Sequence, residues 1–330
     1  MIHLAIIGTN WITDRFLDAA IKSQEFVLTA VYSREKAKAE SFAKTYDNFE
    51  SIRLYDDLSL VCADDKIAAV YIASPNSFHA DQAIQCMQAG KHVIVEKPIA
   101  SNSQQIQLMI ETAIKNNVVL FEAFKTQYLP NFQILKSALP AIGQIRLANL
   151  SYCQYSSRYP KYLAGELPNT FNPEFSNGSL MDIGFYCLST AIALWGKPKN
   201  INACAVKLDS GVDALGIVNL IYDDFLVNIL HSKVSDGVTC SEIQGENGTI
   251  SIEAISECKK ITHINRHDKS SHIISTIDDE NSMVYEARYF AHLIKNKEIN
   301  HQDLLRSQTV IEIIDKIRTI VQIEYPCDNK

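Results

Sequence analysis

The chain has 330 residues, of which 47% are hydrophobic, and it carries 31 Lys and Arg against 38 Asp and Glu. This length matches about two globular domains, and the apolar fraction is sufficient for two buried cores. The formal charge of −7 argues against a protein that binds nucleic acid or an anionic membrane by non-specific attraction. Only 12 residues are Gly, about half the usual ~7%, so each Gly is expected where the backbone requires it.

Cysteine usage and the N-terminus indicate the compartment. The eight cysteines are scattered without the short Cys and His spacings of a zinc site, so we expect no metal. The chain begins on an apolar strand pattern without the basic segment of a secretory signal. No uncharged apolar run approaches the ~20 residues that a membrane-spanning helix needs. These features predict a cytoplasmic protein with no membrane and no nucleic-acid partner.

Alternating strands and helices are predicted for the first 125 residues. Residues 2–7 form a short apolar run that ends at Gly8, and apolar positions then recur at helical spacing over residues 14–21. The alternation continues with strands at residues 27–32, 68–73, 93–95 and 118–124, and helices at residues 35–44, 78–89 and 101–116. Strands without polar alternation are buried on both faces, with helices as covers. The pattern therefore predicts an α/β fold with a parallel, doubly wound Rossmann sheet over residues 1–125.

The remainder, residues 126–330, changes character and predicts an α+β domain. Segments rich in strand-forming residues follow one another at residues 145–155, 201–208, 215–222, 225–231, 241–245 and 249–252. Helices are expected at residues 180–195, 286–295 and 303–323. Direct succession of strands predicts a mostly antiparallel sheet with helices on one side, hence partly open. Because an uncovered sheet face needs a partner, we expect a homodimer or homotetramer.

The first strand-to-helix turn has features of a nucleotide site. It reads Gly8-Thr9-Asn10-Trp11-Ile12-Thr13 where dinucleotide-binding folds carry G-x-G-x-x-G. Such a turn directs free N–H groups and the positive end of the helix dipole toward a pyrophosphate. Only the first Gly of the fingerprint is present, and Asn is the non-Gly residue that best tolerates positive φ. An ordinary buried strand-to-helix turn is the alternative for this motif taken alone.

The end of the second strand favours NADP over NAD. Ser33 and Arg34 stand about 25 residues after Gly8, where an NAD site usually has Asp or Glu for the ribose hydroxyls. A guanidinium and a hydroxyl suit a 2′-phosphate. NAD remains possible, and the alternative is that Arg34 only begins a solvated helix face with Lys36 and Lys38.

Three further motifs identify a family. Ser74-Pro75-Asn76-Ser77-Phe78-His79 follows the strand at residues 68–73, and Glu96-Lys97-Pro98 follows the strand at residues 93–95. Asp182 and Tyr186 lie one helical turn apart after Asn177-Gly178-Ser179. With the opening loop, these motifs resemble the glucose-fructose oxidoreductase/inositol dehydrogenase (Gfo/Idh/MocA) family over nearly the whole chain. Many members have His at the place of Tyr186. With Tyr at this place, the chain resembles the subgroup that contains glucose-fructose oxidoreductase, dimeric dihydrodiol dehydrogenase and NADP-dependent xylose dehydrogenase.

The resemblance implies an NAD(P)-dependent oxidoreductase that transfers a hydride between nicotinamide C4 and a hydroxyl or carbonyl carbon of a sugar, polyol or cyclic diol. A Tyr with a pKa near 10 is a poor base alone, but a neighbouring Lys cation stabilises its phenolate. We therefore expect Tyr186 as acid/base, Lys97 as electrostatic activator and hydroxyl binder, and Asp182 as orienter of Lys97 or of the substrate hydroxyl.

The resemblance also implies contacts with the cofactor and the substrate. Cofactor contacts are expected from the residues at the two later strand ends: Ser74, Pro75, Asn76, Glu96, Lys97 and Pro98. His79 either joins them or is an ordinary helix residue. Candidate substrate residues are Tyr155, Arg158, Tyr159 and Asn172. Two alternatives stay open: a non-catalytic dinucleotide- or sugar-sensing protein, which needs neither Lys97 nor Tyr186, and an NAD-using glycosidase with tightly retained cofactor.

Overall fold

The computed structural model describes residues 1–46, 49–277 and 280–329, and it divides into two compact units. The first unit contains Met1–Lys125 and Glu280–Gln308, and the second contains Thr126–Asp279 and Thr309–Lys330. The first border coincides with the expected one between residues 125 and 126. Residues 280–308, however, return to the first unit, although the sequence predicts them in the second domain.

Six parallel strands form the sheet of the first unit, in the order β3-β2-β1-β4-β5-β6. They are β1 Ile2–Ile7, β2 Phe26–Tyr32, β3 Arg53–Tyr55, β4 Ala69–Ile72, β5 His92–Glu96 and β6 Leu120–Ala123. The chain order reverses between β1 and β4, and open α/β sheets bind ligands at the carboxyl ends of the strands at such a point. The predicted Rossmann sheet is confirmed. β3 is short and half-buried, so no apolar run marks it in the sequence.

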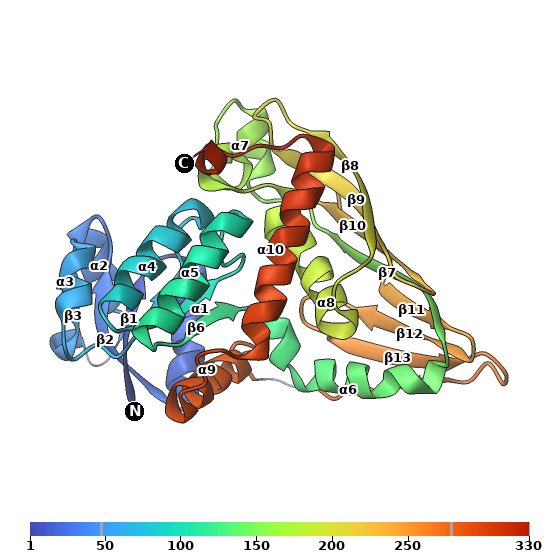
Figure 1. Ribbon diagram of the computed structural model, residues 1–330, viewed down its shortest axis with the longest axis horizontal. Helices are drawn as coiled ribbons and strands as arrows, with labels where there is room; N and C mark the ends of the chain where they lie inside the picture. The colour runs from blue at the N-terminus through green and yellow to red at the C-terminus, as the bar shows by residue number, and fades with distance from the viewer. Residues whose placement is uncertain (47–48, 278–279, 330) are drawn as a thin grey trace. The chain divides into compact units, whose positions relative to one another are not determined.

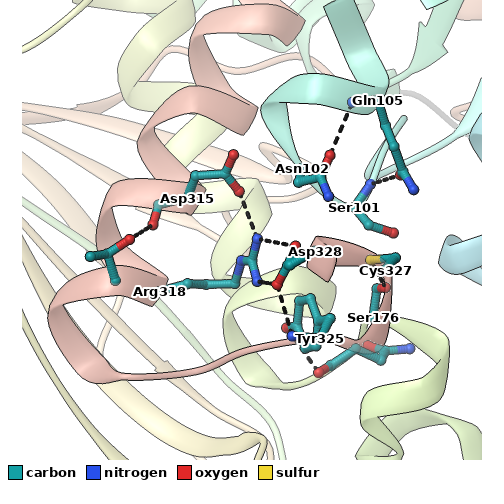
Figure 2. A network of polar contacts seen from close by, with 11 residues as sticks. Ser101, Asn102, Gln105, Ser176, Asp315, Arg318, Tyr325, Cys327 and Asp328 are labelled. Atoms are coloured by element: carbon teal, nitrogen blue, oxygen red, sulfur yellow. Dashed lines mark hydrogen bonds and ion pairs between the residues drawn. The ribbon is translucent and has the colours of Figure 1, made fainter. Parts of the chain in front are cut away.

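Helices cover this sheet. They are α1 Trp11–Lys22, α2 Lys36–Ala43, α3 Leu58–Ala63, α4 His79–Gln88, α5 Ser103–Asn116 and α9 Val284–Asn296, joined by the first turns of α10 Gln302–Val321. α4 packs beside α5, and α1 packs against α9 (Figure 1). Side chains cap the starts of α1, α3 and α5; at α5 the Asn102 side chain accepts a hydrogen bond from the Gln105 N–H (3.0 Å) (Figure 2).

Packing and charge explain why residues 280–308 belong to the first unit. The ring of Phe290 on α9 lies 6.0 Å from that of Phe26 and 5.8 Å from that of Phe121 between centroids. Glu122 at the end of β6 is buried, and its carboxylate pairs with Arg306 (3.2 Å) and accepts a hydrogen bond from the Ser307 hydroxyl (2.7 Å). A buried carboxylate needs such partners. The first 125 residues alone would leave this carboxylate without them.

An eight-stranded mixed sheet forms the second unit, in the order β14-β13-β12-β11-β7-β10-β9-β8. β7 and β10 are parallel neighbours, and the other neighbouring strands are antiparallel. The strands are β7 Ile145–Cys153, β8 Asn200–Lys207, β9 Asp213–Ile221, β10 Leu226–Ser232, β11 Ser241–Gly245, β12 Gly248–Glu253, β13 Lys260–Asn265 and β14 Ser271–Ile273. The predicted mostly antiparallel sheet is confirmed.

The second unit also contains helices, of which α6 and α8 contact the sheet. They are α6 Pro130–Ala138, α7 Tyr159–Leu163, α8 Phe185–Trp195 with the π-helical turn Leu180–Gly184 before it, and the rest of α10. Short 3-10 turns occur in both units at Phe49–Ser51, Asn76–Phe78, Lys125–Tyr128, Leu139–Ile142, Asn169–Phe171, Pro173–Phe175 and Pro326–Asn329. The segment Pro173–Trp195 is long and apolar enough to span a membrane, but 72% of its most apolar window is buried inside the protein. α8 packs against β7 and β10, so it is a core helix (Figure 1).

One face of the second sheet carries exposed apolar side chains. Burial alternates along β9, and Ile217 on the outer face is 38% exposed. Leu226 on β10 and Val206 on β8 are 47% and 58% exposed. The register pairs Leu226 with Ile221 and Val206 with Leu215, which shows that all three exposed residues share this face. We call Val206, Ile217 and Leu226 the open-face residues.

Candidate active site

The loop after β1 can be formed only with Gly at its first position. Gly8 has a φ of +103°, and a Cβ there would lie 2.9 Å from the carbonyl oxygen of Ala73. Its N–H donates to the carbonyl of Tyr32 at the end of β2 (3.2 Å). The loop thus passes close to the ends of β2 and β4, as the backbone of a dinucleotide-binding turn must.

Asn10 fixes the loop by side-chain hydrogen bonds. Its Oδ1 accepts from the N–H groups of Ile12 (3.0 Å) and Thr13 (3.2 Å), and its Nδ2 donates to the carbonyl of Ala73 (2.8 Å). The φ of Asn10 is −96°, so the expectation that Asn serves here by tolerating positive φ is wrong. Asn10 is the N-cap of α1, and it ties the helix start to the end of β4.

The next residues of the loop are open to solvent to different degrees. Thr9 and Ile12 are half-buried, and Trp11 at the first position of α1 is 64% exposed. An exposed indole beside the Gly8 turn is unusual for a large apolar side chain. It gives the loop an intrinsic fluorophore.

The end of β2 presents a cation and a hydroxyl. The Ser33 N–H donates to the carbonyl of Tyr55 (3.1 Å), which holds the turn against β3. Arg34 is exposed, and its guanidinium carbon lies 5.7 Å from the centroid of the Phe78 ring, a cation–π distance. Phe78 belongs to the turn after β4. The Arg34 side chain is therefore held among the carboxyl ends of the parallel strands.

His79 joins the turn after β4 to the turn after β5. Its ring is fully buried, with Nε2 2.8 Å from the carbonyl oxygen of Ser74 and Nδ1 2.9 Å from that of Pro98. Burial lowers the pKa of His79, while the two carbonyl acceptors act in the opposite direction. The enclosed His79 ring thus links the turn after β4 to the turn after β5.

The Lys97 turn is anchored from inside the sheet. Glu96 is buried and accepts a hydrogen bond from the Tyr71 hydroxyl (2.6 Å), and burial raises the pKa of its carboxyl. The Tyr71 ring stacks on Phe16 of α1 at 3.9 Å between centroids. The Lys97–Pro98 peptide bond is cis, and Pro98 is buried while Lys97 is half-buried. Glu96 thus stabilises the turn through its hydrogen bond with Tyr71, and Lys97 is the half-buried cation of this turn.

The predicted cofactor residues of the first unit lie at the carboxyl ends of neighbouring strands. The Gly8 loop follows β1, Ser33 and Arg34 follow β2, Ser74, Pro75 and Asn76 follow β4, and the Lys97 turn follows β5. These strands are neighbours in the order β2-β1-β4-β5. The tight turn at Gly8, where an added Cβ would meet the Ala73 carbonyl oxygen, fits a dinucleotide-binding loop. The cation at Arg34 fits a phosphate, because a phosphate needs a counter-charge.

In the second unit, the helix that carries Asp182 and Tyr186 begins with a π turn. The N–H of Phe185 donates to the carbonyl of Leu180, five residues before it, and α8 continues from Phe185. Such π turns within helices are frequent at functional sites. Asp182 and Tyr186 are both half-buried, and the Tyr186 ring lies 5.7 Å from that of Tyr152 on β7. The expected helix start at residue 180 is confirmed.

Lys233 is a polar residue of this site that the sequence analysis missed. Its ammonium forms an ion pair with the Asp182 carboxylate, and the two side chains are 9% and 30% exposed. We expected Asp182 to orient Lys97 or a substrate hydroxyl, and within the second unit its carboxylate pairs with Lys233. Lys233 follows β10 directly, so a Lys just after a predicted strand is the signal that could have found it.

A buried His–Asp pair supports the start of the π turn. Asp213 Oδ2 accepts a hydrogen bond from the Leu180 N–H (2.6 Å), and His231 Nδ1 lies 2.9 Å from the Ser179 hydroxyl and 3.7 Å from Asp213 Oδ2. Burial raises the pKa of Asp213 to about 6 and lowers that of His231 to about 4. A Cβ on Gly184 would lie 2.9 Å from the His231 ring. The pair therefore explains why this turn contains Gly.

The candidate substrate residues have different surroundings. The Tyr159 ring packs against those of Tyr155 (5.6 Å) and Phe171 (5.7 Å) between centroids. Arg158 is exposed. Asn172 Oδ1 accepts from the N–H of Glu174 (3.0 Å), so part of this side chain caps a 3-10 turn. Tyr155, Arg158 and Tyr159 share one segment after β7, and the N–H of Ser156 in that segment donates to the carbonyl of Lys233 (2.9 Å).

The C-terminal segment braces the loop that leads to the π turn. Arg318 on α10 pairs with Asp328 (2.6 Å) and with Asp315 (2.8 Å) (Figure 2). Its guanidinium carbon lies 4.5 Å from the centroid of the buried Tyr325 ring, and the Tyr325 hydroxyl donates to the carbonyl of Asn177 (3.1 Å). Asn177 precedes the π turn by three residues, so these contacts restrain the entry to the Asp182 helix.

Comparison with known proteins identifies the family. Residues 2–124 match the GFO_IDH_MocA model, described as an oxidoreductase family with an NAD-binding Rossmann fold, and residues 137–251 match the GFO/IDH/MocA C-terminal domain. The chain is 48% identical over 329 residues to the uncharacterized oxidoreductase YgjR of Escherichia coli strain K12, covering 100% of this chain and 99% of YgjR. It is 46% identical over 330 residues to the scyllo-inositol 2-dehydrogenase (NADP(+)) IolU of Bacillus subtilis strain 168, covering 99% of each.

A solved structure supports the same fold. Levoglucosan dehydrogenase in complex with NADH and levoglucosan superimposes with a TM-score of 0.86 at 20% identity, covering 97% of each chain. Within the described residues, no three His, Cys, Asp or Glu side chains gather closely enough to hold a metal ion. The fold, the anchored Lys97 turn and these similarities lead to one conclusion: the chain belongs to the GFO/IDH/MocA oxidoreductase family and is an NAD(P)-dependent dehydrogenase.

Proposed function

We propose that this protein is an NADP(H)-dependent dehydrogenase that interconverts a secondary hydroxyl and a ketone on a cyclic polyol, sugar or cyclic diol. The observation that carries the cofactor choice is the end of β2, where Ser33 and Arg34 stand in place of a ribose-binding carboxylate. The 46% identity to an NADP(+)-dependent scyllo-inositol 2-dehydrogenase favours an inositol-like polyol as the first substrate to test.

The first unit would hold the dinucleotide. The Gly8 turn and the start of α1 would face the pyrophosphate, Ser33 and Arg34 the 2′-phosphate, and the Lys97 turn the nicotinamide side. When bound, the cofactor supplies the acceptor or donor of the hydride at nicotinamide C4. The second unit would provide the substrate contacts, with Tyr155, Arg158, Tyr159 and Asn172 as candidates, and the oligomer interface.

The proton chemistry is assigned to side chains of the chain. During oxidation, the substrate hydroxyl loses its proton to Tyr186 while its carbon loses a hydride, and the product is a ketone; reduction reverses both transfers. A free Tyr has a pKa of about 10, so it needs a neighbouring cation to act as a base near neutral pH. Lys97 is proposed as that cation and Asp182 as the acceptor of a substrate hydrogen bond. With Tyr at this position, the chain resembles the subgroup that contains dimeric dihydrodiol dehydrogenase and NADP-dependent xylose dehydrogenase.

The assembly and the compartment are part of the proposal. The open-face residues of the second sheet favour a homodimer or homotetramer, because an exposed apolar sheet face is stabilised by a partner. A cytoplasmic location is part of the proposal because the eight cysteines are free thiols, as is usual in a reducing compartment.

Two substitutions test the assignment of the reactive groups. Tyr186→Phe removes the acid/base, and the loss of a general acid or base lowers turnover by about 10² to 10⁴-fold. Lys97→Met removes the activating cation and is expected to reduce turnover by a similar factor. Tyr46→Phe and Lys115→Met are matched controls, because Tyr46 hydrogen-bonds Asp14 at the surface and Lys115 lies exposed on α5. Full turnover in Tyr186→Phe would contradict the acid/base role, and full turnover in Lys97→Met would contradict the whole scheme.

The same assays separate the alternative functions. A dinucleotide-sensing protein would bind NADPH without oxidising or reducing any polyol, sugar or diol. An NAD-using glycosidase would consume a glycoside with no net change of nicotinamide absorbance. The proposed dehydrogenase changes nicotinamide absorbance in step with the amount of substrate converted.

A further inference from the structure

Lys233 is a buried cation at a fixed point of the backbone. Its N–H donates to the carbonyl of Ala214 on β9 (2.9 Å), and its carbonyl accepts from the N–H of Ser156 (2.9 Å). Both hydrogen bonds hold the main chain where β10 ends, and the side chain is only 9% exposed. The backbone of Lys233 is therefore fixed by the sheet, and its ammonium is held by burial of the side chain and by the ion pair with Asp182.

The two side chains of the Lys233–Asp182 ion pair are buried to different extents. The Lys233 ammonium lies inside, while the Asp182 side chain is 30% exposed. Burying an ammonium costs free energy unless a carboxylate compensates it. A pair that served stability alone would be as well replaced by apolar side chains. Here a buried cation holds a carboxylate whose side chain is still partly accessible.

Tyr186 follows Asp182 by four residues, across the junction of the π turn and α8. In a regular α-helix this spacing places two side chains about 5–6 Å apart between Cβ atoms. A carboxylate near a phenol opposes its ionisation, and a cation paired with that carboxylate offsets the effect. The Ser156 segment attached to Lys233 also contains the candidate substrate residues Tyr155, Arg158 and Tyr159.

We propose that Lys233 is a positioning residue of the reaction centre, which fixes the Asp182 carboxylate for substrate and neutralises its charge beside Tyr186. This inference rests on the proposed function, in which Asp182 and Tyr186 meet the substrate. Lys233 acts through Asp182, so it sets the pH range in which Tyr186 accepts the hydroxyl proton.

The experiment compares Lys233→Met, Lys233→Arg and Asp182→Asn with the Lys233→Met/Asp182→Asn double variant. The pH dependence of kcat for polyol oxidation is measured for each protein. In Lys233→Met the Asp182 carboxylate loses this cation, which moves the midpoint up by roughly one pH unit, an effect typical of one nearby charge. In Asp182→Asn the Lys233 ammonium loses this carboxylate, although Asp213 still attracts it, and the midpoint moves down. The double variant returns to within a few tenths of a unit of the wild type, and Lys233→Arg stays close to it.

A second readout does not depend on turnover. The phenolate absorbance of Tyr186 is titrated as the difference between the wild type and Tyr186→Phe, and again between Lys233→Met and Lys233→Met/Tyr186→Phe. The midpoint is expected to rise by roughly one pH unit without Lys233. If the wild type oxidises no polyol, sugar or diol, the proposed function fails, and this titration still decides the role of Lys233.

A purely structural role gives a different result. Lys233→Met would then melt at a lower temperature, while the kcat profile and the phenolate titration would keep the wild-type midpoints. Equal midpoints in these variants would overturn the proposal. Opposite shifts in the two single variants that cancel in the double variant would support it.

Discussion

At the scale of single residues, Asn10 replaces a glycine of the nucleotide loop by a different physical device. Glycine serves in such loops by allowing unusual φ and close backbone approach. Asn10 keeps ordinary φ and instead bonds two amide groups of α1 and the carbonyl of Ala73. The close approach is left to Gly8 alone. The loop is thus defined by one glycine and one side chain that links α1 to β4.

Arg34 is predicted to decide the cofactor preference. Charge-assisted bonds to phosphate contribute about 1.5–3 kcal/mol, so Arg34→Ala should weaken NADPH binding by roughly 10 to 100-fold and leave NADH binding nearly unchanged. Binding can be followed by quenching of the fluorescence of Trp11, which is 64% exposed in the loop after β1. Trp195 is the only other tryptophan in the sequence and contributes the remaining signal. Lys36→Ala removes a neighbouring exposed cation and serves as the control. Equal affinities of the wild type for NADPH and NADH would refute the role of Arg34.

At the scale of elements, the π turn depends on two strands that are distant in sequence. β9 supplies Asp213, and β10 supplies His231 and is followed by Lys233. The register pairs His231 with Gly216, and a Cβ on either Gly184 or Gly216 would press on the His231 ring, at 2.9 and 2.8 Å. Glycine on both sides lets the imidazole lie between the sheet and the helix. The position of the Asp182 helix is therefore set by strand pairing.

The His231–Asp213 pair predicts two opposite pH dependences of stability. The pKa of His231 falls to about 4 by burial, against about 6.5 in the unfolded chain, so its contribution is present above pH ~6.5 and is lost as the pH falls to ~4. The pKa of Asp213 rises to about 6, against about 3.9 unfolded, so its contribution is present below pH ~4 and is lost as the pH rises through ~6. Each group contributes roughly 3 kcal/mol to the free energy of unfolding. In the wild type the two contributions change with pH in opposite directions.

Single substitutions should separate the two contributions. In His231→Gln the Asp213 contribution remains, so this variant should lose stability relative to the wild type as the pH rises from 4 to 6. In Asp213→Asn the His231 contribution remains, and stability should fall as the pH decreases from 6.5 to 4. The free energy of unfolding, measured by denaturant titration at several pH values, provides the check. Curves that run parallel to that of the wild type would show that neither group titrates in this way.

Local sequence patterns were sufficient for part of this architecture and not for the rest. The strands of the first sheet other than β3 are largely apolar runs, so the Rossmann sheet and the Lys97 turn at the end of β5 could be predicted. The Lys233–Asp182 ion pair could not, because it forms only when β10 reaches the π turn, 51 residues away along the chain. The return of residues 280–308 was missed for the same reason, since Arg306 meets Glu122 only in the folded unit.

At the scale of the whole molecule, the open-face residues predict self-association. Wild-type protein should sediment at equilibrium as a multiple of the 37.0 kDa monomer mass. Ile217→Lys places a charge in the middle of the exposed apolar face and should shift the protein toward the monomer. Leu108→Lys, which alters an exposed Leu on α5 of the other unit, is the matched control and should leave the mass unchanged. Wild-type protein that sediments at 37.0 kDa would contradict the predicted assembly.

The measurement that tests the central claim most directly is the reduction of NADP⁺ and NAD⁺ by wild-type protein, followed by nicotinamide absorbance, with scyllo-inositol and a panel of sugars and cyclic diols. The account predicts that a cyclic polyol or sugar reduces the cofactor and that NADP⁺ is used in preference to NAD⁺. Binding of NADPH without reduction or oxidation of any compound of the panel, in either direction, would contradict it.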